Sequence, residues 1–292
     1  MAAQAGVETK LREFYARTQA ELESKLPEPD KRDINKLYNC AEYAGGIYTY
    51  LCEREKMTAA KHGYMKNQTE LNEKMRAVLM DWICAVGEKF TLQSETLFLA
   101  ANVVDRYLDC ERITKSRLQL LGATAMVIAS KYEEIYPPEI RDFIHVTEKA
   151  ISKDEILKLE GQILQKLKFE LSGPSVLRFM ERYAKLAGCS EQGTHLAQFM
   201  CELQLLDYGM LRHLPSLVAA GAVYLSQKMV KGASGWSDYL REQSGHNEEE
   251  VKACAKELLA FAQSVTLQAT KKKYSQRKYL EVAKLHLDGV SL

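Results

Sequence analysis

Residues 121–131 read LGATAMVIASK, and residues 218–228, a shift of 97 positions (218 minus 121), read VAAGAVYLSQK. Both stretches are almost wholly apolar and rich in small residues. A helix that is apolar on all sides is buried, and small residues let neighbouring backbones approach closely. Each stretch therefore predicts a helix at the centre of a bundle, and its recurrence predicts two bundles of similar design.

Further helical patterns surround the first central stretch. They are expected at residues 73–90, 95–108, 115–132, a short stretch through 146, and 153–169. Asn72 and Thr114 are the predicted N-caps of the first and third of these helices. Ser152 and Glu155 form a predicted capping box at the start of the fifth.

The pattern begins again after Gly173 and Pro174. The second set is expected at residues 174–187, 194–208, 215–230, 237–243 and 248–267. We predict an all-α fold of two tandem five-helix bundles with an extra N-terminal helix. The predicted organisation is a tail at 1–30, the N-terminal helix at 31–57, bundles at 66–170 and 171–270, and a tail at 271–292.

The overall charge excludes some classes of function. The 292 residues carry 40 basic and 39 acidic side chains, for a net charge of +1. That balance argues against a dedicated nucleic-acid-binding or membrane-surface protein. No run approaches the roughly 18 apolar residues that a membrane span needs. Seven cysteines without a CxxC pair indicate reduced thiols in a cytosolic or nuclear protein.

Familiar catalytic and metal-binding patterns are missing from the sequence. It contains no GxGxxG, GxxxxGK[ST], HExxH or GxSxG motif. The six histidines show no metal-ligand spacing. We therefore expect no cofactor, no metal site and no catalytic residue.

The predicted helix at 73–90 has apolar side chains in nearly every direction. Between residues 77 and 86 its only charge is Asp81. One side, near Ile83 and Val86, can pack against the central helix, but the rest needs another cover. Either the 31–57 helix or a connecting segment covers it, or it forms an exposed apolar groove that takes a peptide.

Several ordered motifs resemble those of mitotic cyclins. They are MRAVLMDW at 75–82, KYEEIYPP at 131–138, FEL at 169–171 followed by Pro174, LDY at 206–208, LPS at 214–216, and KYS at 273–275 followed by KY at 278–279. The resemblance covers about residue 40 to 285 and leans towards the B-type. It implies two cyclin boxes and a non-catalytic subunit that binds and activates a cyclin-dependent kinase in cell-cycle control, at entry into mitosis.

The resemblance also implies which residues face the kinase. Lys131 and Glu160 match the family's lysine and glutamate that contact the kinase near its regulatory helix. The other implied kinase-binding positions are Tyr132, Glu133, Glu134, Leu164, Phe169, Leu171, Tyr43, Ile47 and Tyr50. From the residues alone, a lysine such as Lys131 is usually a solvated helix end, and only its position within the family motif reverses that interpretation. The tyrosines at 43 and 50 are equally well packed on the bundle.

A substrate-docking groove is implied for the helix at 73–90. In A-type cyclins the matching helix binds Arg-x-Leu peptides of substrates and inhibitors. The matching positions are Met75, Val78, Leu79, Trp82 and Gln119. Ala85 stands where the family has an acidic residue that receives the peptide's arginine, so the arginine contact is expected to be weak.

A DNA-binding transcription factor of the general factor IIB type is the alternative, because it uses the same double bundle. That class carries a strongly basic face and a zinc ribbon. The single basic run here is residues 271–273 with Arg277 and Lys278, which we interpret as a solvated tail rather than a nuclear signal. We expect a protein of the nucleus and cytoplasm, whose partners are a cyclin-dependent kinase and Arg-x-Leu-type peptides, and not nucleic acid or membrane.

Overall fold

The computed structural model describes residues 13, 16–18, 20–21, 23–231 and 235–287. It divides into two parts, residues 1–53 and 54–292, which are taken separately below. Much of the predicted N-terminal tail, and the final residues 288–292 of the predicted C-terminal tail, lie outside the described residues. Among the described residues all regular elements are helical, so the predicted all-α class is confirmed.

Between residues 28 and 53 the chain forms short helical pieces rather than one long helix. They include α2 (Glu28–Lys31), the 3₁₀ turns η1 (Leu37–Asn39) and η2 (Ala41–Tyr43), and the start of α3 (Ala44–Thr58). The predicted helix at 31–57 is therefore wrong before Ala44. Cys40, between the two turns, has a left-handed backbone with φ of 44°, which no continuous right-handed helix accommodates.

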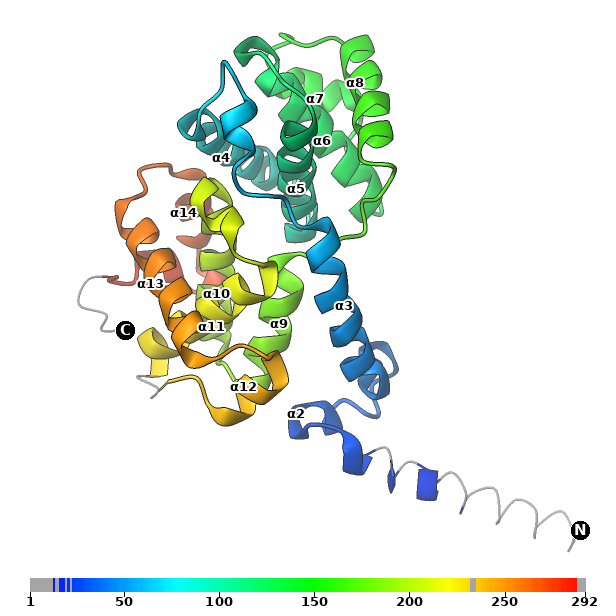
Figure 1. Ribbon diagram of the computed structural model, residues 1–292, viewed down its shortest axis with the longest axis vertical. Coiled ribbons are helices and arrows are strands. Elements are labelled where there is room, and N and C mark those ends of the chain that lie inside the picture. The colour runs from blue at the N-terminus through cyan, green and yellow to red at the C-terminus, as the bar shows by residue number, and fades with distance from the viewer. Residues whose placement is uncertain (1–12, 14–15, 19, 22, 232–234, 288–292) are drawn as a thin grey trace, which may run out of the picture. The chain divides into compact units, whose positions relative to one another are not determined.

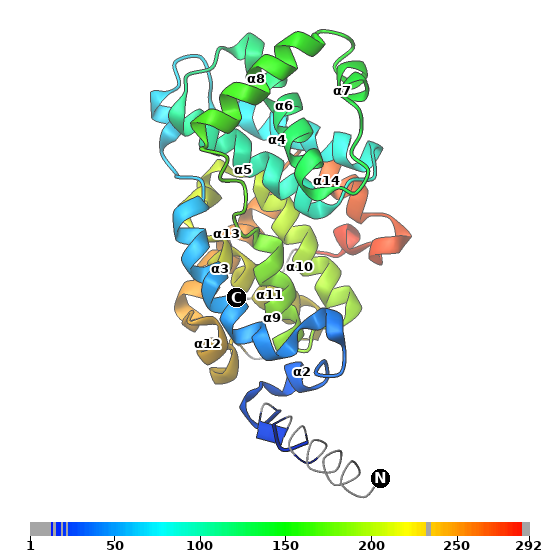
Figure 2. The same ribbon diagram turned by 90° about the vertical axis from the view of Figure 1, so that its right-hand side faces the viewer.

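The first bundle consists of α4 (Glu73–Lys89), α5 (Ser94–Cys110), α6 (Leu118–Glu133), α7 (Ile140–Val146) and α8 (Lys153–Lys166) (Figure 1). Helix α6 lies among the other four (Figure 2), and its residues 120–130 are all buried, as predicted for the central helix. Gly122 permits the close approach of α4, because a Cβ atom there would lie 2.6 Å from Cδ1 of Leu79.

The second bundle repeats this design. It consists of α9 (Val176–Leu186), α10 (Glu191–Leu203), α11 (Pro215–Lys231), α12 (Asp238–Ser244) and α13 (Glu248–Ser264) (Figure 1). Helix α11 packs against α9, α10 and α13. Its residues 218–226 are all buried. The internal repeat therefore predicted the centres of both bundles correctly.

Local capping bonds start α4 and α8 where the sequence predicts. The Asn72 side chain accepts a hydrogen bond from the backbone N–H of Met75 at 3.0 Å. Ser152 and Glu155 form the complete capping box at the start of α8. Each bond satisfies a backbone donor that the helix itself leaves without a partner.

Thr114 does not cap α6, contrary to the prediction. Residues 115–117 form a 3₁₀ turn, and α6 begins only at Leu118. The Thr114 hydroxyl shares a hydrogen bond with the Ser116 hydroxyl at 3.1 Å, and it makes no capping bond to the backbone.

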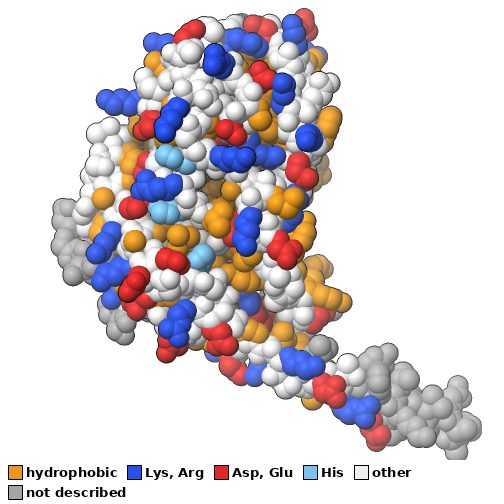
Figure 3. All heavy atoms as spheres, in the orientation of Figure 1, with side chains coloured by type: hydrophobic (Ala, Val, Ile, Leu, Met, Phe, Trp, Pro, Cys, Tyr) orange, Lys and Arg blue, Asp and Glu red, His pale blue; other side chains and the backbone are white. Residues whose placement is uncertain are grey.

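The surface is charged but of mixed sign. Lys and Arg side chains are interspersed with Asp and Glu side chains over the described part of the face in Figure 3. This mixture matches the near-zero net charge of the sequence. Among the described residues, no helix is long and apolar enough to cross a bilayer.

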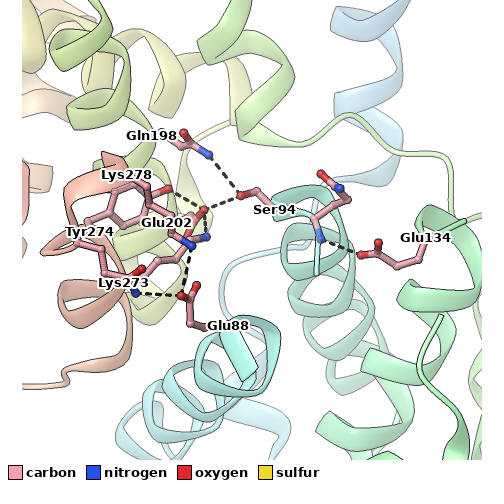
Figure 4. A network of polar contacts seen from close by, with 10 residues as sticks. Glu88, Ser94, Glu134, Gln198, Glu202, Lys273, Tyr274 and Lys278 are labelled. Carbon is pink, nitrogen blue, oxygen red and sulfur yellow. Dashed lines mark hydrogen bonds and ion pairs between the residues drawn. The ribbon is translucent and has the colours of Figure 1, made fainter. Parts of the chain in front are cut away.

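The C-terminal segment is folded onto both bundles. It forms α14 (Ala269–Tyr274), η7 (Arg277–Tyr279) and η8 (Val282–Lys284), which pack against α4 and α10. Lys273 is buried, and its Nζ lies 2.8 Å from each carboxylate oxygen of Glu202 in α10 (Figure 4). The interpretation of the basic run at 271–273 as a solvated tail is therefore wrong for Lys273.

Buried polar contacts join the two bundles within residues 54–292. Arg76 of α4 donates from Nε to Asp105 of α5 at 2.6 Å. The same guanidinium donates from Nη1 to the carbonyl oxygen of Leu205, just after α10, at 2.9 Å. Ser94, at the start of α5, donates to Glu202 at 2.8 Å (Figure 4). Helices α4 and α5 are thereby fixed against the second bundle.

Candidate functional site

Lys131 and Glu160 meet at the surface of the first bundle. Lys131 closes the buried run of α6, and Glu160 comes from the middle of α8. The lysine Nζ lies 2.7 and 2.9 Å from the two carboxylate oxygens of Glu160. The lysine side chain is 49% exposed and the glutamate side chain 14% exposed. The structure thus brings these two predicted residues into one ion pair that a partner can reach.

Large apolar side chains are exposed at the ends of these two helices. Tyr132 is 51% exposed at the end of α6, and Phe169 is 69% exposed after α8. Of the other predicted apolar contacts, Leu164 is half-buried and Leu171 is buried. Leu171 is therefore a packing residue in this structure and offers little surface to a partner.

The backbone at Phe169 is left-handed, with φ of 58°. This conformation is strained for a bulky residue. A hydrogen bond from its backbone N–H to the carbonyl oxygen of Leu164, 2.8 Å long, holds the turn. The chain thus keeps an aromatic ring at the surface in a conformation that local preference disfavours, and such outliers cluster at functional sites.

Ile135 and Tyr136 are more exposed than any predicted hydrophobic contact, at 87% and 92%. Both residues belong to the motif KYEEIYPP at 131–138, but they were not among the predicted site residues. Their position between two glutamates and two prolines could have indicated that they are exposed. Neither a helix nor a bundle core continues through such a stretch, so its apolar side chains have nowhere to be buried.

The two glutamates after Tyr132 have different environments. Glu134 accepts hydrogen bonds from the backbone N–H of Gln93 at 2.8 Å and from the Thr96 hydroxyl at 2.5 Å, so it holds the start of α5. Within the described residues, Glu133 makes no such hydrogen bond to the start of α5. Partial burial raises the pKa of the Glu133 carboxyl, and the neighbouring Glu95 carboxylate raises it further.

Three predicted contacts belong to residues 1–53. Tyr43 ends the turn η2, and Ile47 and Tyr50 follow in the first part of α3. They are 63%, 47% and 54% exposed. Ile47 and Tyr50 are three residues apart, so they share one face of the helix.

An open groove lies on the outer side of α4. Its cavity has a volume of about 530 Å³ and is lined by Asn72, Lys74, Met75, Val78, Leu79, Trp82, Lys115, Leu118 and Gln119. All five positions that the sequence assigned to a docking groove are in this set. Leu79 is buried and forms the floor, whereas Val78 is 58% exposed. No described segment of residues 54–287 covers this apolar face of α4.

Family comparisons agree with the two-bundle architecture. Residues 46–172 match the family described as Cyclin, N-terminal domain. Residues 174–288 match the family described as Cyclin, C-terminal domain. The junction at residue 173 falls in the linker between α8 and α9.

Curated relatives are named as mitotic cyclins. The chain is 40% identical to G2/mitotic-specific cyclin-B of Dictyostelium discoideum, over 83% of this chain and 56% of that protein. It is 38% identical to G2/mitotic-specific cyclin-B of Hydra vulgaris, over 89% of this chain and 73% of that protein. Cyclin-A2 of Xenopus laevis is 39% identical, over 82% of this chain and 59% of that protein. The chain thus spans between 56% and 73% of the length of these relatives.

A solved structure shares the fold at low sequence identity. The viral cyclin from Herpesvirus saimiri superposes with a TM-score of 0.68 and 21% identity, over 75% of this chain and 97% of the viral one. The curated relatives and both family matches are cyclins, so the factor IIB type of protein is not favoured. This chain belongs to the cyclin family, and within it to the mitotic group of B- and A-type cyclins.

Proposed function

We propose that this chain is a regulatory subunit that binds and activates a cyclin-dependent protein kinase, without a catalytic residue of its own, in control of entry into mitosis. The observation that carries the proposal is the surface ion pair of Lys131 and Glu160 beside exposed aromatic residues. Charged groups next to large apolar side chains are typical of the energetic centre of a protein–protein interface.

Activation needs only a preference for one kinase conformation. An active kinase requires an ion pair between a strand lysine and a glutamate of its regulatory helix. A partner that binds this arrangement better than the open one shifts the equilibrium towards it. Lys131 and Glu160 supply a rigid surface for such binding, because α6 and α8 are packed on each other.

The kinase-binding role is tested with the double variant Lys131→Ala/Glu160→Ala. If both charged groups are buried in the complex, their loss weakens kinase binding by about 2–5 kcal/mol. Kinase affinity and histone phosphorylation are measured with a purified cyclin-dependent kinase. The control replaces Lys284 and Glu281 with alanine, since they form a surface pair of similar length, 2.9 Å. Normal activation by a folded Lys131/Glu160 variant would refute the assigned surface.

We also propose that the α4 groove docks leucine-containing segments of the Arg-x-Leu type in substrates or inhibitors. The groove offers an apolar floor at Leu79 and an apolar wall that includes Trp82. Burying a leucine side chain there contributes roughly 1.5–3 kcal/mol. Trp82→Ala is expected to slow phosphorylation of a substrate with a docking leucine and to leave a short substrate without one unaffected. An equal effect on both substrates would contradict docking at this groove.

A further inference from the structure

The docking groove is bordered by positive charge and has no carboxylate in its lining. Its polar lining residues are Asn72, Lys74, Lys115 and Gln119. The Asn72 side chain already caps α4. Lys74 and Lys115 are exposed, and no ion pair of either is found within the described residues. Two lysines therefore face the apolar groove from one end.

The backbone adds to this positive potential. Lys74 is in the first turn of α4, and Lys115 begins the turn that leads into α6. Helix N-termini carry a partial positive charge. Two acidic residues are nearby. Glu70 accepts a hydrogen bond from the backbone N–H of Lys115 at 3.1 Å, and Glu73 is in the first turn of α4. Neither carboxylate lines the groove.

The face of α4 that continues beyond Trp82 offers a peptide arginine no carboxylate. Ala85, one turn after Trp82 on the same face of α4, is exposed and carries no carboxylate, and Lys89 follows one turn later. The remaining acids of α4 beyond its first turn are engaged elsewhere. Asp81 accepts from the backbone N–H of Ala269 at 2.9 Å, and Glu88 accepts from the Gln276 amide at 2.9 Å. A peptide arginine on this face would thus find no free acidic partner on α4 beyond its first turn.

We propose that the groove selects a peptide whose leucine-class side chain is flanked by Asp or Glu, and disfavours a flanking Arg. This inference rests on the docking role proposed above for the same groove. The leucine enters between Val78 and Trp82, and the acidic side chains reach Lys74 and Lys115. The apolar anchor is shared with Arg-x-Leu peptides, while the preferred charge of the flanking residues is reversed.

Three labelled peptides test the charge preference. They share one leucine motif and differ only in flanking residues, which are Asp and Glu, Ser, or Arg. The wild-type protein is expected to bind the acidic peptide most tightly and the basic peptide most weakly. Each lysine is expected to contribute about two- to fivefold, as an exposed ion pair does. The difference between the peptides should shrink as salt is added.

Variants identify the groups responsible. Lys74→Glu/Lys115→Glu is expected to reverse the order of the acidic and basic peptides. Ala85→Glu should tighten the basic peptide alone. Lys256→Glu, an exposed lysine on α13 in the second bundle, is the control for a charge reversal, and it should keep the wild-type order. Circular dichroism confirms that each variant is folded.

The outcomes separate this inference from the docking role. Equal binding of all three peptides by the wild type, lost in Trp82→Ala, would overturn the acidic preference and keep the groove. Tighter binding of the basic peptide would overturn it equally. If no peptide binds the wild type, both the docking role and the preference are overturned. An acidic preference that disappears in Lys74→Glu/Lys115→Glu supports the inference.

Discussion

Glu202 shows, at the scale of single residues, how a buried charge is stabilised. Its side chain is fully buried and accepts hydrogen bonds from three residues: Lys273 through Nζ, Tyr274 through its hydroxyl and Ser94 through its hydroxyl, each at 2.8 Å (Figure 4). Burial, and secondarily the Glu202 carboxylate, raise the pKa of Tyr274 well above its ordinary value. Tyr274 therefore remains a hydrogen-bond donor at all physiological pH values. A buried carboxylate is tolerated because its oxygens are satisfied in this way.

Removing one member of this buried ion pair should be costly. Lys273→Met keeps most of the aliphatic volume but leaves Glu202 without its counter-charge. Such uncompensated burial destabilises a protein by about 3–5 kcal/mol. Urea unfolding followed by circular dichroism measures the change in free energy. The exposed neighbour Lys272 supplies the control, since Lys272→Met should change the free energy by less than about 0.5 kcal/mol. Similar losses in the two variants would mean that the buried ion pair contributes no more to the free energy of unfolding than an exposed lysine does.

At the scale of helices, sequence reasoning succeeded where the information is local. Asn72, and Ser152 with Glu155, act within one turn of their own position, so spacing alone reveals them. The centres of α6 and α11 were predictable because a helix that is apolar on all sides is buried away from water. The helix that forms the groove stood out because its apolar side chains point in nearly every direction, whereas the individual groove positions were implied by the resemblance to A-type cyclins.

Where the outcome depends on distant residues, sequence reasoning failed. The lysine-rich start of α14 has no apolar period, and its fold depends on Glu202, 71 residues earlier in the chain. Because spacing does not reveal that Lys273 pairs with Glu202, the sequence placed the end of the ordered fold at residue 270. Lys74 and Lys115 were missed at the groove for a similar reason: a surface lysine gives no periodic signal, and only the fold places these two together.

For the whole of residues 54–292, the two bundles act as one unit because polar groups are buried between them. Arg76 is 1% exposed and Asp105 is 2% exposed, and together they make the bidentate contact that orients Arg76 towards Leu205. The Tyr208 hydroxyl adds hydrogen bonds from the backbone N–H groups of Gly63 and Met65, at 2.8 and 3.0 Å. Separating the bundles would leave these groups without partners or expose them to water.

The bundles are therefore expected to unfold together. Scanning calorimetry of the full chain should show one main transition for them, with calorimetric and van't Hoff enthalpies in agreement. Asp105→Asn leaves Arg76 with no counter-charge and should lower the free energy of unfolding by about 3–5 kcal/mol. Asp109→Asn, at an exposed position on the same helix, should have little effect. Two well-separated transitions in the wild-type protein would contradict this coupling.

The packing of the C-terminal segment on α4 has a consequence for how the protein is made. Asp81 accepts a hydrogen bond from the backbone of Ala269, and Glu88 accepts one from the side chain of Gln276. Each donor lies 188 residues later in the chain than its acceptor. A ribosome exposes α4 long before it synthesises either partner. Contacts so distant in sequence form late and slow folding. The nascent chain must therefore carry the face of α4 that packs against α14 incompletely covered until residues 269–276 have been synthesised, which makes that interval the most vulnerable to aggregation or chaperone capture.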